Sequence, residues 1–185
     1  NCQRAIASVL VNRGLTLPEQ ARRFLHPSVA QIRSPFLMKD MEVAVSRIIR
    51  SIQNGEKILV FGDYDADGIT GTALLVDFFS SLNTAIEYHI PNRLTEGYGL
   101  TPEAVQRYAV ARDIDLVITV DCGIGSHKAV ETARKAGIDV IITDHHQVPE
   151  RLPDALAIIN PKRPDCPSPF SWLAGVGVAF NLVLA

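Results

Sequence analysis

Three carboxylates stand at alternate positions in one short stretch of the chain. Asp63, Asp65 and Asp67 follow the apolar run 58–61 and precede Gly68 and a second apolar run. Carboxylates this close repel one another, and they are costly to hold together unless a cation neutralises them or some lose their charge. Oxygen ligands suit Mg²⁺ or Mn²⁺, and open α/β sheets place their ligands at the tips of parallel strands. The stretch predicts a metal site at a turn between a strand and a helix.

Other interpretations of this stretch exist. A crowded turn without function would also contain Asp and Gly, because turns favour both residue types. A calcium loop of the EF-hand type requires a glutamate where this chain has Leu74, and a helix where it has the expected strand, so it is excluded. A phosphatase with an aspartyl nucleophile places Asp-x-Asp after a strand, as in Asp65 and Asp67, and this alternative stays open.

Two later strands are expected to end in groups of the same kind. Asp121 follows one of them, and Asp144, His145 and His146 follow the next. Because right-handed crossovers bring the ends of parallel strands to one edge of the sheet, these side chains should share a crevice with the first three carboxylates. Such a set suits two divalent ions about 4 Å apart, which cleave phosphate esters by activating water and clamping the displaced oxygens. Asp121, with Gly123 leaving room beside it, is the candidate for the bridging ligand.

The elements that must position these residues alternate between strand and helix. We expect an α/β fold of Rossmann type, a mostly parallel sheet with helices on both faces. A short helical extension, residues 1–40, should precede the α/β domain 41–185, and it should contain helices at 4–11 and 18–25. The expected strands are 57–61, 86–90, 115–120, 138–143 and 155–159, and the expected helices of the domain are 41–53, 70–82, 102–111, 126–135 and a closing helix.

Composition sets limits on class and compartment. The chain has 185 residues, 47% apolar and 21% charged, which is ordinary for a packed domain, and its net charge of −2 gives no basic signature. Nucleic-acid binding would therefore need a local patch or metal-mediated phosphate contacts. Cys2, Cys122 and Cys166 form no Cys-x-x-Cys pair, so neither a disulfide framework nor a zinc ribbon is indicated. With no membrane span or signal peptide recognised, we expect a cytoplasmic protein without membrane contact.

The ordered set of motifs resembles the DHH phosphoesterase superfamily. The motifs are Gly62–Gly68, Val120–Gly123 and Asp144–His146. Residues 91–99 and 173–180 are similar to the RecJ family of single-strand-specific exonucleases within that superfamily, and the match covers most of residues 40–185. The resemblance implies a metal-dependent hydrolase that removes nucleotides from the 5′ end of single-stranded DNA in repair and recombination. Digestion polarity and preference for DNA come from the resemblance only, and the preferred metal is open.

The resemblance also implies roles for individual residues. The ligands of two Mn²⁺ or Mg²⁺ ions would be Asp63, Asp65, Asp67, Asp121 and His145, and the catalytic set would be Asp65, Asp67, Asp121, His145 and His146. Asp144 would orient the ligands, and His146 would face the phosphate. A further metal-binding Asp of the family would lie past Ala185, as the chain stops within an apolar helical pattern. We therefore expect a fragment truncated at its C-terminal end, with weak or no activity alone.

Four further residues are candidates for contact with single-stranded DNA. Arg93 can fork two phosphate oxygens from a glycine-rich loop, and Tyr98 can stack on a base. Gly175 and Gly177 let a backbone approach a phosphate or a neighbouring helix. A helicase or a single-strand-binding protein as partner follows from the resemblance only. Besides the phosphatase, a non-catalytic DHH-fold module for DNA binding or scaffolding stays open.

Overall fold

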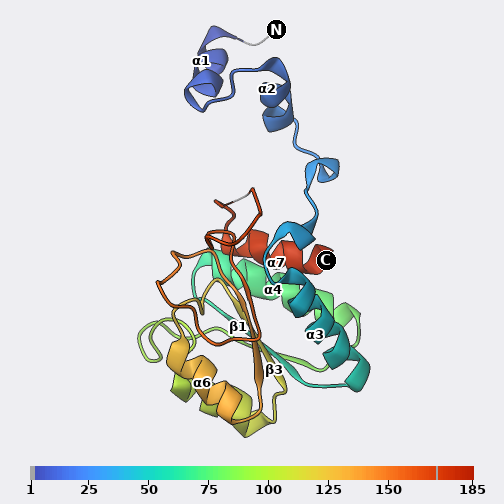
Figure 1. The fold of residues 1–185 in the computed structure, drawn as a ribbon, viewed down its shortest axis with the longest axis vertical. Coiled ribbons are helices and arrows are strands. Elements are labelled where there is room, and N and C mark those ends of the chain that lie inside the picture. Colours follow the sequence, from blue (N-terminus) through green and yellow to red (C-terminus); the bar gives the residue numbers. More distant parts are fainter. Residues whose placement is uncertain (1–2, 170) are drawn as a thin grey trace. The chain divides into compact units, whose positions relative to one another are not determined.

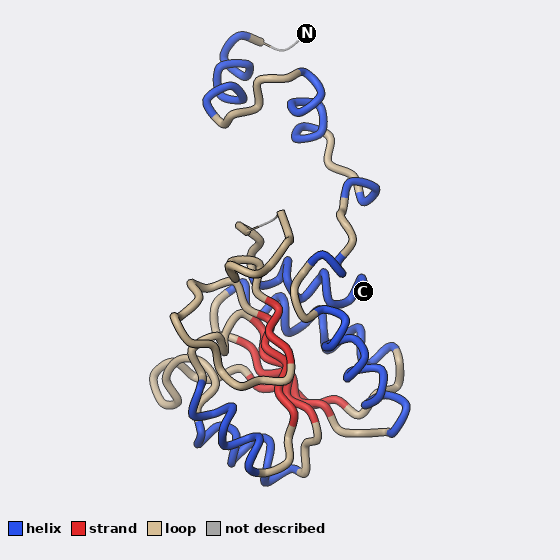
Figure 2. Tube along the Cα trace, viewed as in Figure 1, coloured by secondary structure: helices blue, strands red, loops and turns tan. Residues whose placement is uncertain are grey.

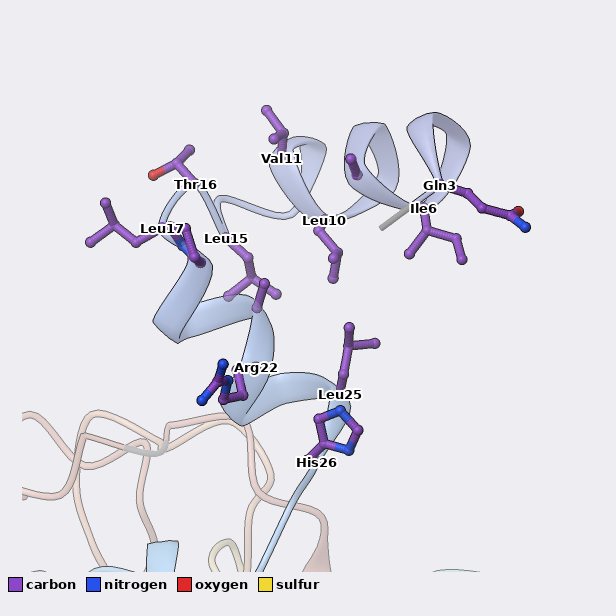
Figure 3. Close-up of a pocket in the computed structure, with 13 residues that line it drawn as sticks. Gln3, Ile6, Leu10, Val11, Leu15, Thr16, Leu17, Arg22, Leu25 and His26 are labelled. Atoms are coloured by element: carbon purple, nitrogen blue, oxygen red, sulfur yellow. The ribbon is translucent and has the colours of Figure 1, made fainter. Parts of the chain in front are cut away.

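The computed structural model describes residues 3–169 and 171–185, which divide into two compact units between Arg33 and Ser34. In the first unit, α1 (Arg4–Asn12) and α2 (Pro18–Leu25) form where the sequence predicts helices. They border a hollow of about 730 Å³, and Figure 3 shows Leu10, Leu15 and Leu25 around it. None of the described residues that line this hollow is a carboxylate, so they offer no site for the predicted metal chemistry.

The second unit is built on a parallel sheet of five strands in the order β2-β1-β3-β4-β5 (Figure 1). The predicted α/β class is confirmed, and each observed strand lies within two residues of its predicted position. The strands are β1 (Ile58–Gly62), β2 (Ile86–His89), β3 (Leu116–Val120), β4 (Asp139–Thr143) and β5 (Ala157–Ile159). Every residue of β1 and β3 is buried, as expected for the central strands of a sheet that is covered on both faces.

Helices cover both faces of the sheet (Figure 2). Alternate residues of β1, β3, β4 and β5 pack in two separate clusters, one on each face. On one face Ile58, Val60 and Ile118 pack in a cluster that includes residues of α3 (Met41–Asn54), α4 (Ala66–Ser81) and α7 (Gly175–Leu184). On the other face Leu59, Phe61 and Val117 pack in a second cluster. That cluster includes residues of α6 (His127–Lys135) and of the helical run made of α5 (Pro102–Ala104), η3 (Val105–Ala109) and η4 (Val110–Arg112).

The start of α4 differs from the sequence prediction. The helix was expected from residue 70, but it begins at Ala66, so Asp67 lies in its first turn. Asp65 causes this early start, because its Oδ1 accepts hydrogen bonds from the backbone N–H groups of Asp67 at 2.9 Å and Gly68 at 3.1 Å. A Cβ at Gly68 would lie 2.5 Å from the Asp63 carbonyl oxygen, so only glycine lets the helix start this close to β1.

A buried arginine fastens α3 to the base of the sheet. Arg47 donates hydrogen bonds to Asp139 at 2.5 Å and to Glu56 at 2.6 Å, and it also contacts Ser51. A buried guanidinium is stable only when it is paired, so these partners act as one unit. Burial alone would raise the pKa of Glu56, but hydrogen bonds from Arg47, Ser51 and Asn54 lower it. In the described residues, no helix combines the length and the apolar character needed to cross a membrane.

Candidate metal centre

The first carboxylates of the site leave the sheet at the C-terminal end of β1. Asp63 is 3% exposed, and its Oδ1 accepts the backbone N–H of Tyr64 at 2.7 Å. Burial raises the pKa of Asp63, and the negative charges of Asp65 and Asp144 add to that rise. Asp65 is exposed and uses one oxygen to cap α4, which leaves the other free of that task. The sequence thus places one buried and one exposed carboxylate side by side.

Asp67 connects this end of β1 to a helix more than a hundred residues away. Its two carboxylate oxygens accept the backbone N–H groups of Gly175 at 2.6 Å and Val176 at 2.7 Å, the first residues of α7. The same carboxylate lies 3.4 Å from Nε2 of His145. Because the free N–H groups at a helix N-terminus attract negative charge, Asp67 fixes where α7 begins.

Asp121 lies at the centre of the site, on the tip of β3. It is 1% exposed and has a φ of 60°, a left-handed conformation that Asp tolerates better than most residues. Its Oδ1 lies 3.0 Å from Nε2 of His145, yet no hydrogen bond satisfies it within the part of the chain that the structure describes. Burial, followed by the charges of Asp67 and Asp65, raises the pKa of Asp121 to about 7.

The space beside Asp121 exists only because Gly175 has no side chain. A Cβ on this glycine would lie 2.5 Å from Oδ1 of Asp121. Gly175 therefore lets the start of α7 approach the buried Asp121 carboxylate, and its predicted contact with a phosphate stays a prediction. Gly177 is less restricted, because its Cβ would meet only the Leu173 side chain, at 3.2 Å.

Asp144 holds the two histidines that follow β4. It is 1% exposed, and its Oδ1 accepts the backbone N–H of His145 at 2.7 Å, the backbone N–H of His146 at 3.0 Å and Nδ1 of His146 at 2.8 Å. Its other oxygen accepts the backbone N–H of Ile124 at 2.9 Å. Burial would lower the pKa of His146, but the hydrogen bond to Asp144 and the surrounding carboxylates raise it. The geometry supports the orienting role predicted for Asp144.

The side chains from three strands meet at one place. Asp63, Asp65 and Asp121 offer ligand atoms that lie within 4.8 Å of one another, and so do Asp121, His145 and His146. Asp121 belongs to both groups, as expected of a ligand shared between two ions. Asp67 lies beside these groups but belongs to neither, so its role as a metal ligand stays a prediction.

A model of the DHH family, N-terminal domain, matches residues 57–184 of this chain. The chain belongs to the DHH family. The matched region begins at the start of β1 and ends within α7, so the DHH domain contains every carboxylate and imidazole of the site.

Relatives of known function lie within the same family. The single-stranded-DNA-specific exonuclease RecJ of Bacillus subtilis is 46% identical over 180 residues, 97% of this chain and 23% of the relative. RecJ of Escherichia coli is 51% identical over 149 residues, 80% of the chain and 26% of the relative. A solved structure of Thermus thermophilus RecJ in complex with Mn²⁺ is similar with a TM-score of 0.73 and 32% identity, covering 97% of this chain and 24% of that one. The chain thus spans about a quarter of the length of these relatives.

Two of the predicted substrate residues, Arg93 and Tyr98, lie on the loop that follows β2. Tyr98 is exposed, and its hydroxyl lies 3.5 Å from Nδ1 of His146. Burial of its hydroxyl, followed by the nearby carboxylates, raises the pKa of Tyr98 far above its ordinary value. Arg93, on the same loop, is exposed and lies over the ring of Tyr64. A groove of about 720 Å³, lined among others by Tyr98, His146 and Lys128, adjoins the site.

Sequence reasoning missed the residues that hold this loop. Glu96 accepts hydrogen bonds from the hydroxyl of Tyr108 at 2.6 Å and the backbone N–H of Asn92 at 2.8 Å, and it lies 3.1 Å from the His89 ring. His89 stacks on Tyr108 with centroids 3.6 Å apart. Asn160, fully buried after β5, donates to the His146 carbonyl at 3.0 Å. Of these residues, only Asn160 could have been found from the sequence, because it follows the end of a predicted strand.

Proposed function

We propose that the protein containing this chain is a metal-dependent exonuclease that hydrolyses single-stranded DNA from its 5′ end in DNA repair and recombination. The observation that supports this most is the position of Asp121, which shares ligand-atom geometry with Asp63 and Asp65 on one side and with His145 and His146 on the other. The names of the related exonucleases support the substrate and the reaction.

The residues present fit a pair of divalent cations. Carboxylate oxygens and imidazole nitrogens are donors that Mn²⁺ accepts, and carboxylates also suit Mg²⁺. The buried Oδ1 of Asp121 accepts no hydrogen bond from the described residues, and a cation would satisfy it. The residues that would hold the ions are Asp63, Asp65, Asp67, Asp121 and His145. When bound, such ions activate water and stabilise the charge on the displaced oxygen of a phosphodiester.

The chain's own residues orient the reacting groups. The Asp144 carboxylate accepts a hydrogen bond from Nδ1–H of His146, so Nε2 of His146 stays available for the substrate. Arg93 can donate two parallel hydrogen bonds to a phosphate, and Tyr98, exposed beside His146, offers a ring face for a base. The groove next to His146 gives a strand of DNA room to lie against the site.

The test is digestion of single-stranded oligonucleotides, labelled at the 5′ or the 3′ end, by the full-length protein with Mn²⁺, Mg²⁺ or a chelator. We expect metal-dependent release of 5′ nucleotides that Asp121→Asn and His145→Ala abolish. Asp113→Asn is the matched control, because Asp113 has a left-handed φ of 54° that Asn also tolerates and precedes β3 at its opposite end. Unchanged rates in Asp121→Asn, or release from the 3′ label, would contradict the proposal.

The same variants test the aspartyl-nucleophile phosphatase. That mechanism requires a phosphorylated Asp65 and makes His145 dispensable, whereas the proposed nuclease requires His145 and forms no phosphoenzyme. A helicase or a single-strand-binding protein as partner is a proposal supported by the resemblance alone.

A further inference from the structure

We propose that Tyr64 is a positioning residue that holds the Arg93 guanidinium beside the metal centre, ready to bind a phosphate of the DNA strand. This inference rests on the proposed function, because it gives the residue that orients a group expected to contact the substrate. Neither the motif of alternating carboxylates nor the predicted substrate set assigns a role to Tyr64.

Tyr64 lies between two acidic residues of the site in the sequence, but Arg93 contacts the Tyr64 ring and not a carboxylate. It is half-buried between Asp63 and Asp65, and the Arg93 Cζ lies 5.4 Å from its ring centroid. In the described chain, no ion pair joins Arg93 to a carboxylate. Arg112 differs, because it lies over the ring of Tyr108 and also pairs with Glu87 at 2.6 Å.

The choice of an aromatic partner has a chemical consequence. A guanidinium over a ring face is attracted through the ring quadrupole and does not use its N–H groups on an anion. Those N–H groups form a planar fork that matches two phosphate oxygens. A carboxylate partner would occupy the same fork and neutralise the charge of the guanidinium. The Tyr64 ring thus restrains Arg93 without neutralising it.

Further ring contacts connect Tyr64 to the histidines. The rings of Tyr64 and Tyr98 meet edge to face at 6.2 Å, and those of Tyr98 and His146 do so at 6.1 Å. Glu96 anchors the same loop through its bonds to Asn92 and Tyr108. Glu96 therefore holds the loop that carries Arg93 on one side, and Tyr64 and Tyr98 connect it to the metal centre.

The test compares Tyr64→Leu, which removes the ring, with Tyr64→Phe, which keeps it, in the full-length protein. Affinity for a single-stranded oligonucleotide is measured by fluorescence anisotropy in chelator, and KM and kcat are measured separately with Mn²⁺. We expect Tyr64→Leu to weaken binding and raise KM by about three- to ten-fold, with a smaller change in kcat, since a contact of this kind contributes that much. Tyr64→Phe should stay within about two-fold of the parent.

A double-variant cycle tests whether Tyr64 acts through Arg93. If it does, Tyr64→Leu has no further effect on affinity in an Arg93→Ala background. A full effect of Tyr64→Leu in that background would overturn the inference. So would weakened Mn²⁺ binding by Tyr64→Leu, measured by titration calorimetry, because the tyrosine would then act on the metal donors.

Tyr88→Leu is the matched control, because Tyr88 is 61% exposed on β2 and makes no contact with the site in the described residues. It should leave affinity and KM unchanged, and an equal loss in this variant would overturn the inference. The proposed nuclease function and the role of Tyr64 can be refuted independently of each other. A parent protein without nuclease activity refutes the proposed function, whereas the anisotropy cycle still reports whether Tyr64 and Arg93 are coupled in binding DNA.

Discussion

Asp67→Asn should loosen the start of α7 even when no metal is present. The parent carboxylate accepts two backbone N–H groups, at 2.6 and 2.7 Å, and an amide keeps only one acceptor oxygen. Losing a hydrogen bond to a charged acceptor and leaving a donor unsatisfied costs about 1.5–3 kcal/mol. With a loss of about 2 kcal/mol, the amides of Gly175 and Val176 should exchange about thirty-fold faster with solvent.

The measurement is hydrogen exchange in chelator, followed by mass spectrometry of the full-length protein. Asp65→Asn is the matched control, since its Oδ1 alone caps α4 and Asn caps a helix about as well as Asp. It should leave exchange in α4 and α7 nearly unchanged. If Asp67→Asn and Asp65→Asn show equal protection of α7 in chelator, then Asp67 has no structural role of this size and the reasoning is refuted.

Three further outcomes follow from the geometry. Gly175→Ala should lower the melting temperature and weaken Mn²⁺ binding, because its Cβ would lie 2.5 Å from Oδ1 of Asp121; thermal melts and calorimetry that match the parent would contradict this. The pKa of Glu56 is lowered in the folded protein, so the stability that its carboxylate contributes is present above its ordinary pKa of 4.5 and is lost as the pH falls. The free energy of unfolding, measured in urea, should therefore decrease less steeply with falling pH in Glu56→Gln than in the parent. Lys128→Ala should reduce the slope of log affinity for single-stranded DNA against log salt by about 1, whereas Lys135→Ala, paired with Glu131 on the same helix, should not.

The sequence predicted the convergence of the site because that depends on regular rules. Asp63, Asp121 and Asp144 each follow a buried strand, and parallel strands with right-handed crossovers deliver their ends to one edge. Burial of the strands was readable from their apolar runs. The family was indicated separately, by the resemblance of the ordered motifs to known sequences.

The parts that the sequence could not predict depend on contacts between distant residues. The hydrogen bonds from Gly175 and Val176 to Asp67 join residues more than a hundred positions apart, and no periodicity indicates them. The start of α4 was placed four residues too late, because Asp65 was read as a metal-binding or catalytic residue and not also as a helix cap. The stack of His89 on Tyr108 likewise joins a strand to a helix, and no pattern in the sequence indicates that these two residues meet.

The strand order places one part of the site after interior strands and another part after an edge strand. The metal donors follow β1, β3 and β4, which have neighbours on both sides, whereas the loop with Arg93 follows β2 at the border of the sheet. Border strands open more readily than interior ones, since fewer ladder bonds restrain them. The loop that carries Arg93 should therefore exchange its amide protons faster than the segments that carry the carboxylates and histidines of the site.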